Sequence, residues 1–411
     1  MSDIYDVIAI GGGAAGMMAA GRAGERGKRV LLLEKNAKLG EKLSISGGGR
    51  CNILNAEENE RALLAHYGKA EQFLYSPFSQ FGMRDAYDFF EKRGLPLRVE
   101  ARKRAFPHSE NASDVVRTLA DYLKQGTVEV RTRTPVLDIV TESGSVQKVI
   151  TRDGEYSAHS YILATGGVSH PETGSTGDGF AWLSRLGLPV QKPTPTIVPL
   201  RASDAWIKKL SGITVKDAKI TFFCDDKRAF AVRGDILCTH FGLSGPTILN
   251  VAGKVSSLLE SGTVTAEINT SPDMDLGILE RTITGIFDEN KNKLLKNVFK
   301  DIAPPGTGAV VLGLVSVDPE TKVHSVTKEQ RRVLAKLLKA LPVSITSLMG
   351  FDRAVVADGG LPLTEVDTKT MRIRAYSNLY VTGDLLHVTR PSGGYSLQLA
   401  WTTGYVAGSH A

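Results

Sequence analysis

The sequence contains little cysteine, and its three cysteines are far apart. Cys51, Cys224 and Cys238 form no CxxC pair and no cluster with histidine at metal-ligand spacing, so we expect neither a disulfide framework nor a metal site. Long apolar runs are also lacking. The first run, in MSDIYDVIAI, is far shorter than the ~20 residues of a membrane helix, and its aspartates argue against a signal peptide. We therefore expect a cytoplasmic protein without a membrane span.

Internal repeats, low-complexity tracts and a strong charge imbalance are lacking as well. Without repeats, solenoids and other arrays are excluded. The chain has 50 basic and 44 acidic residues, a mild excess for 411 residues. Its densest basic stretch, residues 98–104 (RVEARKR), is typical of a solvated face, so we do not expect nucleic acid as a partner. A chain of this length and ordinary hydrophobic content predicts two or three packed domains.

The first 34 residues have the pattern of a nucleotide-binding βαβ unit. Residues 4–10 and 29–34 are apolar runs typical of buried parallel strands, and residues 14–26 have helical periodicity. Between them, Gly11, Gly13 and Gly16 form G-x-G-x-x-G, which permits a tight turn, close approach of a pyrophosphate, and close helix-strand packing. The phosphates would lie on the helix N-terminus, at Ala14 and Ala15.

An acidic residue at the end of the second strand completes this unit. Glu34 stands eighteen residues beyond Gly16, where a carboxylate can accept hydrogen bonds from an adenosine ribose and would repel the 2′-phosphate of NADP. The next segment, SGGGRCN at residues 46–52, has three consecutive glycines whose amides can approach a flat ring or a phosphate. These features favour an extended cofactor, and we predict non-covalently bound FAD.

The rest of the chain predicts an interrupted α/β fold. A helix is expected over 111–126, with Ser113 as candidate N-cap, followed by strands over 127–165 with turns at 143–144 and 153–154. Four prolines within 189–199 indicate a domain boundary. We predict a Rossmann-like FAD-binding domain of residues 1–194 and 351–411, a β-rich insertion over 195–272 and a helical cap over 273–350, with strand-like character from 342 to the end.

Several motifs together resemble a family of bacterial flavoproteins. SGGGRCN, ILATGG (162–167), SHPETGSTGDG (169–179), THFGLSGP (239–246) and the segments 381–388 and 392–408 are similar to those of the BaiN/RdsA group, which includes an aminoacetone oxidase. The resemblance spans nearly the whole chain. It implies one FAD, an inserted β-barrel-like domain with a helical cap, adenine contacts from Val136, ribityl or phosphate contacts from Gly383 and Asp384, and flavin contacts from Gly393 to Tyr395.

The chain departs from that group near the expected flavin. Asp384 stands where a glutamate is usual, the segment 384–395 reads DLLHVTRPSGGY, and His170 replaces a tyrosine. Asp384 could also cap a helix instead of holding a cofactor hydroxyl. The substrate therefore cannot be transferred from a relative, and the candidate catalytic groups are His170, His240, His387, Arg390 and Tyr395.

The complete predicted cofactor-binding set follows the cofactor from one end to the other: Gly11, Gly13, Ala14, Ala15, Gly16, Glu34, Lys35, Lys42, Ser46, Gly47, Gly48, Gly49, Arg50, Cys51, Asn52, Val136, Ala164, Thr165, Gly166, Gly383, Asp384, Gly393, Gly394 and Tyr395.

Three functions stay open at this point. The first is a reductase that passes hydride from NADH or NADPH to an unsaturated or carbonyl compound. The second is an amine-type oxidase that reduces oxygen. The third is a flavoprotein that acts on or binds RNA. Only one G-x-G-x-x-G is present, so NAD(P)H would bind transiently if it is the electron donor. We expect a small-molecule substrate between the cofactor domain and the insertion.

Overall fold

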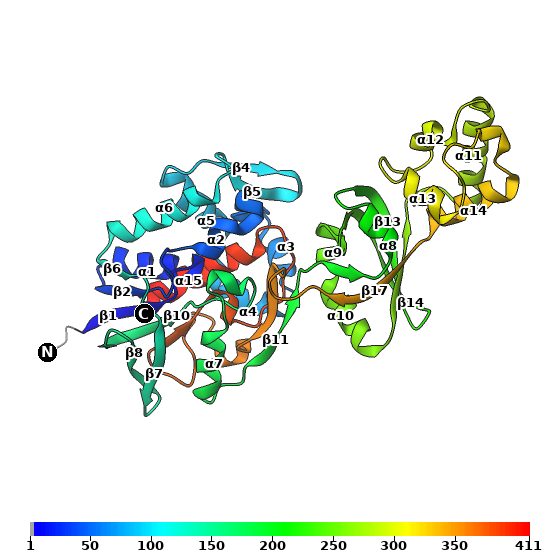
Figure 1. The fold of residues 1–411 in the computed structure, drawn as a ribbon. Helices are drawn as coiled ribbons and strands as arrows, with labels where there is room; N and C mark the ends of the chain where they lie inside the picture. The colour runs from blue at the N-terminus through cyan, green and yellow to red at the C-terminus, as the bar shows by residue number, and fades with distance from the viewer. Residues whose placement is uncertain (1–3) are drawn as a thin grey trace. The chain divides into compact units, whose positions relative to one another are not determined.

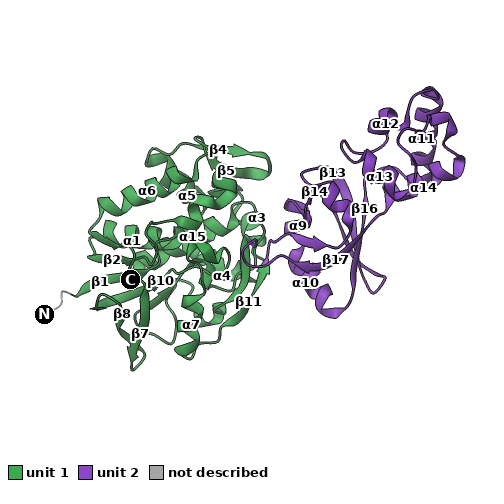
Figure 2. Ribbon diagram, in the orientation of Figure 1, with its two compact units in different colours: residues 1–195, 355–411 green, residues 196–354 purple. Residues whose placement is uncertain are grey.

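The computed structural model describes residues 4–411 and divides them into two compact units (Figure 2). Unit 1 contains the chain up to residue 195 and residues 355–411, and unit 2 contains residues 196–354. Each unit has its own hydrophobic core. Unit 2 is thus an insertion into the fold of unit 1, and each is described separately.

A five-stranded parallel sheet forms the centre of unit 1 (Figure 1). Its order is β19 (Leu379–Val381), β10 (Ala158–Leu163), β1 (Tyr5–Ile10), β2 (Val30–Leu33) and β6 (Val128–Arg131). β1 and β2 are apolar and almost wholly buried, because a parallel sheet is covered on both faces. The predicted βαβ unit and the Rossmann-like fold class are confirmed.

Helices cover this sheet. The helices of unit 1 are α1 (Ala14–Glu25), α2 (Glu41–Ile45), α3 (Glu60–Ala65), α4 (Glu71–Gln80), α5 (Met83–Lys92), α6 (Ala112–Gln125), α7 (Asp178–Arg185) and α15 (Tyr395–His410), with short 3-10 turns η1 (Ser46–Gly49), η2 (Gly68–Ala70), η3 (Ala101–Lys103), η4 (Pro171–Thr173), η7 (Leu363–Glu365) and η8 (Gly383–Leu385). α15 packs directly against α1, because a side chain at Gly404 would lie 2.5 Å from Ala15 O. The strand-like character that we predicted from residue 342 to the C-terminus agrees with strands at Leu341–Leu348, Val356–Gly360 and Leu379–Val381, but it is wrong for 395–410, which form a buried helix rich in small residues.

Three small sheets complete unit 1: β3 (Leu54–Asn55) with β5 (Arg104–Pro107) and β4 (Leu97–Glu100); β7 (Val136–Glu142) with β8 (Ser145–Thr151) and β9 (Glu155–Tyr156); and β11 (Gln191–Thr196) with β18 (Val356–Gly360). The turn at Ser143-Gly144 has positive φ at both residues, as a two-residue hairpin requires. The proline-rich segment, where we predicted a domain boundary, forms β11, a strand with a single neighbour, where prolines are tolerated.

The cap of α6 differs from the prediction by two residues. The side chain of Asn111 accepts a hydrogen bond from Ser113 N–H at 2.9 Å, so Asn111 is the N-cap and Ser113 lies inside the helix. Both residue types are good caps, and the spacing alone did not distinguish them.

Unit 2 contains a closed six-stranded barrel. Its order is β12 (Leu200–Ala202), β15 (Gly242–Ser244), β14 (Lys227–Thr239), β13 (Thr214–Cys224), β16 (Val264–Asn269) and β17 (Leu341–Leu348), and all neighbours are antiparallel. Short helices α8 (Ala205–Lys209), α9 (Pro246–Leu249) and α10 (Ala252–Ser261) connect its strands. The predicted barrel-like insertion is confirmed as a fold.

The helical part of unit 2 lies between β16 and β17. It comprises α11 (Leu276–Glu289), α12 (Leu295–Val298), α13 (Gly308–Leu314) and α14 (Lys328–Lys339), with turns η5 (Phe299–Asp301) and η6 (Val323–Ser325). Residues 341–348, which we assigned to the helical cap, form β17 and close the barrel through β12 and β16. Alternation of LPVSITSL is the period-2 pattern of a strand.

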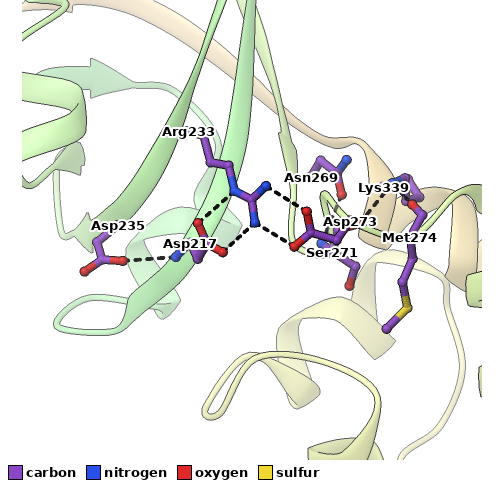
Figure 3. A network of polar contacts seen from close by, with 8 residues as sticks. All are labelled: Asp217, Arg233, Asp235, Asn269, Ser271, Asp273, Met274 and Lys339. Atoms are coloured by element: carbon purple, nitrogen blue, oxygen red, sulfur yellow. Dashed lines mark hydrogen bonds and ion pairs between the residues drawn. The ribbon is translucent and has the colours of Figure 1, made fainter.

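An ion-pair network joins the barrel to the connection that precedes the helical part (Figure 3). Arg233 of β14 donates to both oxygens of Asp217 (2.8 and 2.6 Å) and of Asp273 (2.8 and 2.6 Å). Lys339 donates to Ser271 O at 3.0 Å. These contacts tie the β16–α11 connection to β14 and α14.

Candidate active site

The predicted cofactor segments lie at the carboxyl edge of the parallel sheet. Ile10 pairs with Leu163, and Leu163 pairs with Val381, so β1, β10 and β19 end side by side. The chain continues from these ends into Gly11, Ala164 and Thr382. Ligands of open α/β sheets bind at this edge, and three segments far apart in the sequence meet there.

The three glycines of the first turn have three different surroundings. Gly11 has φ +107°, and a Cβ there would lie 2.5 Å from Ala164 O. A Cβ on Gly16 would overlap Gly11 O, whereas a Cβ on Gly13 would meet nothing within 4 Å. The turn is therefore tight at Gly11, packed at Gly16 and open at Gly13, which is the arrangement that an approaching pyrophosphate needs.

Glu34 is 8% exposed and braces this turn. Gly12 N–H donates to Oε2 at 2.6 Å, and Asn36 N–H donates to Oε1 at 2.7 Å. Each carboxylate oxygen keeps further lone-pair capacity. The carboxylate is thus held in a fixed orientation at the end of β2, where it could also accept from ribose hydroxyls.

The segment 169–179 lies over residues 35 and 36. Lys35 Nζ donates to Asp178 Oδ2 at 2.7 Å and to Thr176 Oγ1 at 2.6 Å. His170, a predicted catalytic residue, has its Nδ1 2.8 Å from Glu172 Oε1. Lys35 and His170 therefore have protein partners within this loop region.

The SGGGRCN segment contains the predicted glycine turn, but its charged residue is engaged elsewhere. Gly47, Gly48 and Gly49 all have positive φ, and a Cβ on Gly48 or Gly49 would meet nothing within 4 Å. Arg50 pairs with Glu100 (2.6 Å) and Glu110 (2.9 Å), and its guanidinium lies 4.2 Å from the centre of the Phe106 ring. This turn therefore offers open glycine backbone to a ligand, while the Arg50 guanidinium is held by two carboxylates.

Cys51 and Ser46 lie at the two ends of this turn. Cys51 is fully buried, and burial raises the pKa of its thiol to about 12. Since the thiolate is the reactive form, Cys51 is unsuited to redox chemistry at neutral pH. Ser46 Oγ donates to Leu43 O at 2.7 Å.

Two asparagines hold the predicted flavin loop in place. Asn55 Nδ2 donates to Gly393 O at 3.2 Å, and the Asn52 amide oxygen accepts from Gly394 N–H at 3.0 Å. A Cβ on Gly394 would overlap the backbone of Leu54. The sequence analysis included Asn52 but missed Asn55, because a single amide six residues beyond Gly49 is a weak signal.

The remaining predicted groups lie in five places. Asp384 accepts from Lys42 Nζ at 2.9 Å and from the guanidinium of Arg390, so its carboxylate does not cap a helix. Arg390 is 5% exposed.

The other predicted groups lie apart from this pair. Tyr395 begins α15, and its backbone oxygen accepts from Tyr67 Oη at 2.9 Å. His387 is half-buried, and Val136 is the first residue of β7. His240 is an exposed residue of unit 2, between β14 and β15.

The residues at the carboxyl edge fit a dinucleotide cofactor. The N-terminus of α1 has no acidic residue in its first turn and a glycine as N-cap, so its amides suit a phosphate. Within residues 4–411, Thr165 Oγ1 is buried beside this edge without a hydrogen-bond partner. The same described residues contain no group of three or more metal-ligating side chains and no helix long and apolar enough to cross a membrane.

Replacing Glu34 with alanine is expected to weaken FAD binding roughly 10- to 100-fold, because charge-assisted hydrogen bonds contribute about 1.5–3 kcal/mol each. Titration of apoprotein with FAD, followed by flavin fluorescence, measures this. The variant should also lose some stability, since Gly12 and Asn36 lose their acceptor. An unchanged Kd for FAD would contradict the ribose role, whatever happens to the melting temperature of the apoprotein.

Comparison with known proteins gives full-length matches. The family model described as HI0933-like protein Rossmann domain matches residues 5–410. A ribosomal RNA dihydrouridine synthase of Escherichia coli is 28% identical, covering 98% of this chain and 96% of its own. A 3-dehydro-bile acid delta(4,6)-reductase of Clostridium scindens is 27% identical, covering 98% of both chains.

Solved structures with the same fold include two ketosteroid dehydrogenases at low identity. The 3-ketosteroid-delta4-(5alpha)-dehydrogenase of Rhodococcus jostii matches 100% of this chain and 97% of its own, with a TM-score of 0.54 and 14% identity. The 3-ketosteroid delta1-dehydrogenase of Sterolibacterium denitrificans matches 100% and 99%, with a TM-score of 0.55 and 14% identity. From the fold, the carboxyl-edge site and the family match together, the chain belongs to the HI0933-like Rossmann family and is an FAD-dependent oxidoreductase.

Proposed function

We propose that this protein is a reductase of a carbon-carbon double bond conjugated with a carbonyl group, and that NADH or NADPH binds transiently to supply the electrons. The observation that carries the proposal is the pair of full-length relatives. One is named for making dihydrouridine and the other for reducing delta(4,6) bonds of a 3-dehydro-bile acid. Both names describe the addition of two hydrogens to such a bond.

The overall reaction is balanced by one hydride and one proton. NAD(P)H is oxidised to NAD(P)⁺, the β-carbon of the substrate gains the hydride, and the α-carbon gains a proton. Bound FAD would supply the two-electron transfer. Among this chain's residues, Tyr395 is suited to hold a proton, since burial raises the pKa of its hydroxyl to about 12. His387 is the second candidate proton donor.

We favour a small molecule as the substrate. In the densest basic stretch, Arg98 pairs with Glu100 (2.6 Å) and Lys103 with Glu57 (2.5 Å), so these cations are not a free track for phosphates. Ribosomal RNA is the second candidate substrate, favoured by relatives from Escherichia coli and Haemophilus influenzae that are named ribosomal RNA dihydrouridine synthases, at 28% and 26% identity.

Anaerobic rapid mixing tests the proposal. Bleaching of the flavin absorbance by NADH or NADPH identifies the donor. Reduced enzyme is then mixed with a 3-keto-4-ene steroid, with unmodified ribosomal RNA fragments, or with oxygen. We expect an unsaturated carbonyl compound to reoxidise the flavin and to gain two hydrogens by mass spectrometry. Reoxidation by oxygen alone, with hydrogen peroxide as product, would support an oxidase and contradict the proposal.

A further inference from the structure

Three charged side chains meet at the carboxyl edge of unit 1. Asp384 of η8 accepts from Lys42 of α2 at 2.9 Å through Oδ2 and from Arg390 through Oδ1. Two cations thus share one carboxylate, which leaves the cluster with one net positive charge. We call these three residues the edge cluster.

The two cations differ in burial and in the number of their partners. The Arg390 side chain is 1% exposed, and it also donates to Val388 O at 2.6 Å and to Ser396 Oγ at 3.0 Å. The Lys42 side chain is 30% exposed, and its remaining contact is Ser169 Oγ at 3.4 Å. Arg390 is fixed and neutralises Asp384, so the surplus charge of the edge cluster belongs to Lys42.

The carboxyl of Asp384 stays ionised inside this cluster. Burial alone would raise its pKa, but the attraction of Lys42 and Arg390 outweighs burial and holds the pKa well below its ordinary value. The carboxylate of Asp384 therefore keeps its negative charge over the neutral range.

The edge cluster lies along the path of an extended cofactor. A Cβ on Gly383 would be 3.3 Å from Ala15 Cβ, at the phosphate end of α1, and a Cβ on Gly166 would be 3.8 Å from Lys42 Nζ. Along the chain, the cluster is followed by Gly393 and Gly394, the predicted flavin contacts. Arg390 also donates to Ser396 Oγ, close behind those glycines in the chain, so the cluster adjoins both the phosphate turn and the flavin loop.

We propose that Lys42, held by Asp384, sets the reduction potential of the bound flavin by placing one net positive charge beside it. Reduction adds negative charge to the flavin ring, and a nearby cation stabilises the reduced form. Arg390 is a positioning residue, since it acts by holding Asp384. This proposal requires only that the protein binds FAD. Its test uses no substrate, so the proposal can fail while the proposed reaction remains correct.

The test is the midpoint potential of the bound FAD, measured by equilibration with reference dyes under anaerobic conditions. Lys42→Met removes the surplus charge and should lower the potential. Asp384→Asn removes the negative charge and should raise it. We expect each shift to correspond to about a tenfold change in the ratio of reduced to oxidised flavin, or about 30 mV for two electrons.

Opposite signs are the decisive feature, because both substitutions break the same ion pair. Lys42→Arg should keep the potential, and Lys42→Glu should lower it further than Lys42→Met. If Asp384→Asn does not fold, the potentials of the three Lys42 variants alone still test whether the charge of Lys42 sets the flavin potential. The matched control is Lys148→Met, which removes a lysine paired with Glu155 at 2.6 Å outside the predicted cofactor-binding set and should leave the potential unchanged.

Two results would overturn the proposal. Shifts of the same sign in Lys42→Met and Asp384→Asn would mean that the cluster only maintains local structure. A Lys42→Met protein with weaker FAD affinity but an unchanged potential would mean that Lys42 serves as a phosphate ligand instead.

Discussion

Replacing Gly16 with alanine is expected to destabilise unit 1 by about 3 kcal/mol and to abolish FAD retention. The new Cβ would overlap Gly11 O, and overpacking of this kind costs about 1–3 kcal/mol or more. Alanine gains about 1 kcal/mol of helix propensity over glycine, but backbone overlap outweighs that gain. Chemical denaturation of the apoprotein measures the loss directly.

Gly13→Ala is the matched control for this substitution. Its φ is −84°, and its Cβ would meet nothing within 4 Å, so the apoprotein should keep wild-type stability. The added methyl group would occupy the space that a pyrophosphate needs, and FAD affinity should fall. Equal stability of the Gly16→Ala and Gly13→Ala apoproteins would contradict the packing roles that we assign to the two glycines.

Arg390→Ala is expected to be the most damaging change of a charged residue, at about 3 kcal/mol. Removing one partner of a buried ion pair costs about 3–5 kcal/mol, and Asp384 retains Lys42, which places the expected loss at the lower end. Val388 O and Ser396 Oγ also lose their donor. Thermal release of FAD, followed by its fluorescence, should occur at a clearly lower temperature.

Arg233→Ala is the informative comparison, because Arg233 makes more ion-pair contacts than Arg390. Its side chain is 43% exposed, and exposed pairs are screened by water and salt. Its removal should lower stability far less than Arg390→Ala. If the two variants were equally stable, burial would not be what makes the edge cluster important.

The sequence was sufficient to predict the cofactor half of the fold. G-x-G-x-x-G between two apolar runs has few alternatives, and the structure gives each of Gly11, Gly13 and Gly16 a distinct environment. Parallel strands bring their carboxyl ends together, so the positions of Glu34, Ala164 and Gly383 near one edge followed from the strand assignments alone.

Partners between distant segments could not be predicted. Arg390 could have faced solvent or a ligand, and only the fold brings Lys42 and Asp384 to it. Likewise, Asn55 contacts Gly393 across 338 positions of sequence. Side-chain direction in loops is set by tertiary packing, and neither composition nor periodicity reports it.

Local sequence patterns were also misassigned in two segments, because the same pattern can occur in a helix or in a strand. LPVSITSL follows directly after a helix, and we placed it inside the helical cap, although the strand-like character that we expected from residue 342 and its period-2 alternation both agree with β17. The segment 395–410 is rich in Gly, Ala and Thr because it packs against α1 at small residues such as Gly404. Close helix packing explains this composition, which we interpreted as strand-like.

The most direct test of the account is the identity of the released cofactor. Protein purified gently, or apoprotein reconstituted with a mixture of FAD and FMN, is denatured, and the released flavin is separated by chromatography. We expect one FAD per chain and no FMN, because the α1 turn and Glu34 form a site for the ADP part, which FMN lacks. Release of FMN, or failure of the folded apoprotein to take up either flavin, would contradict the account.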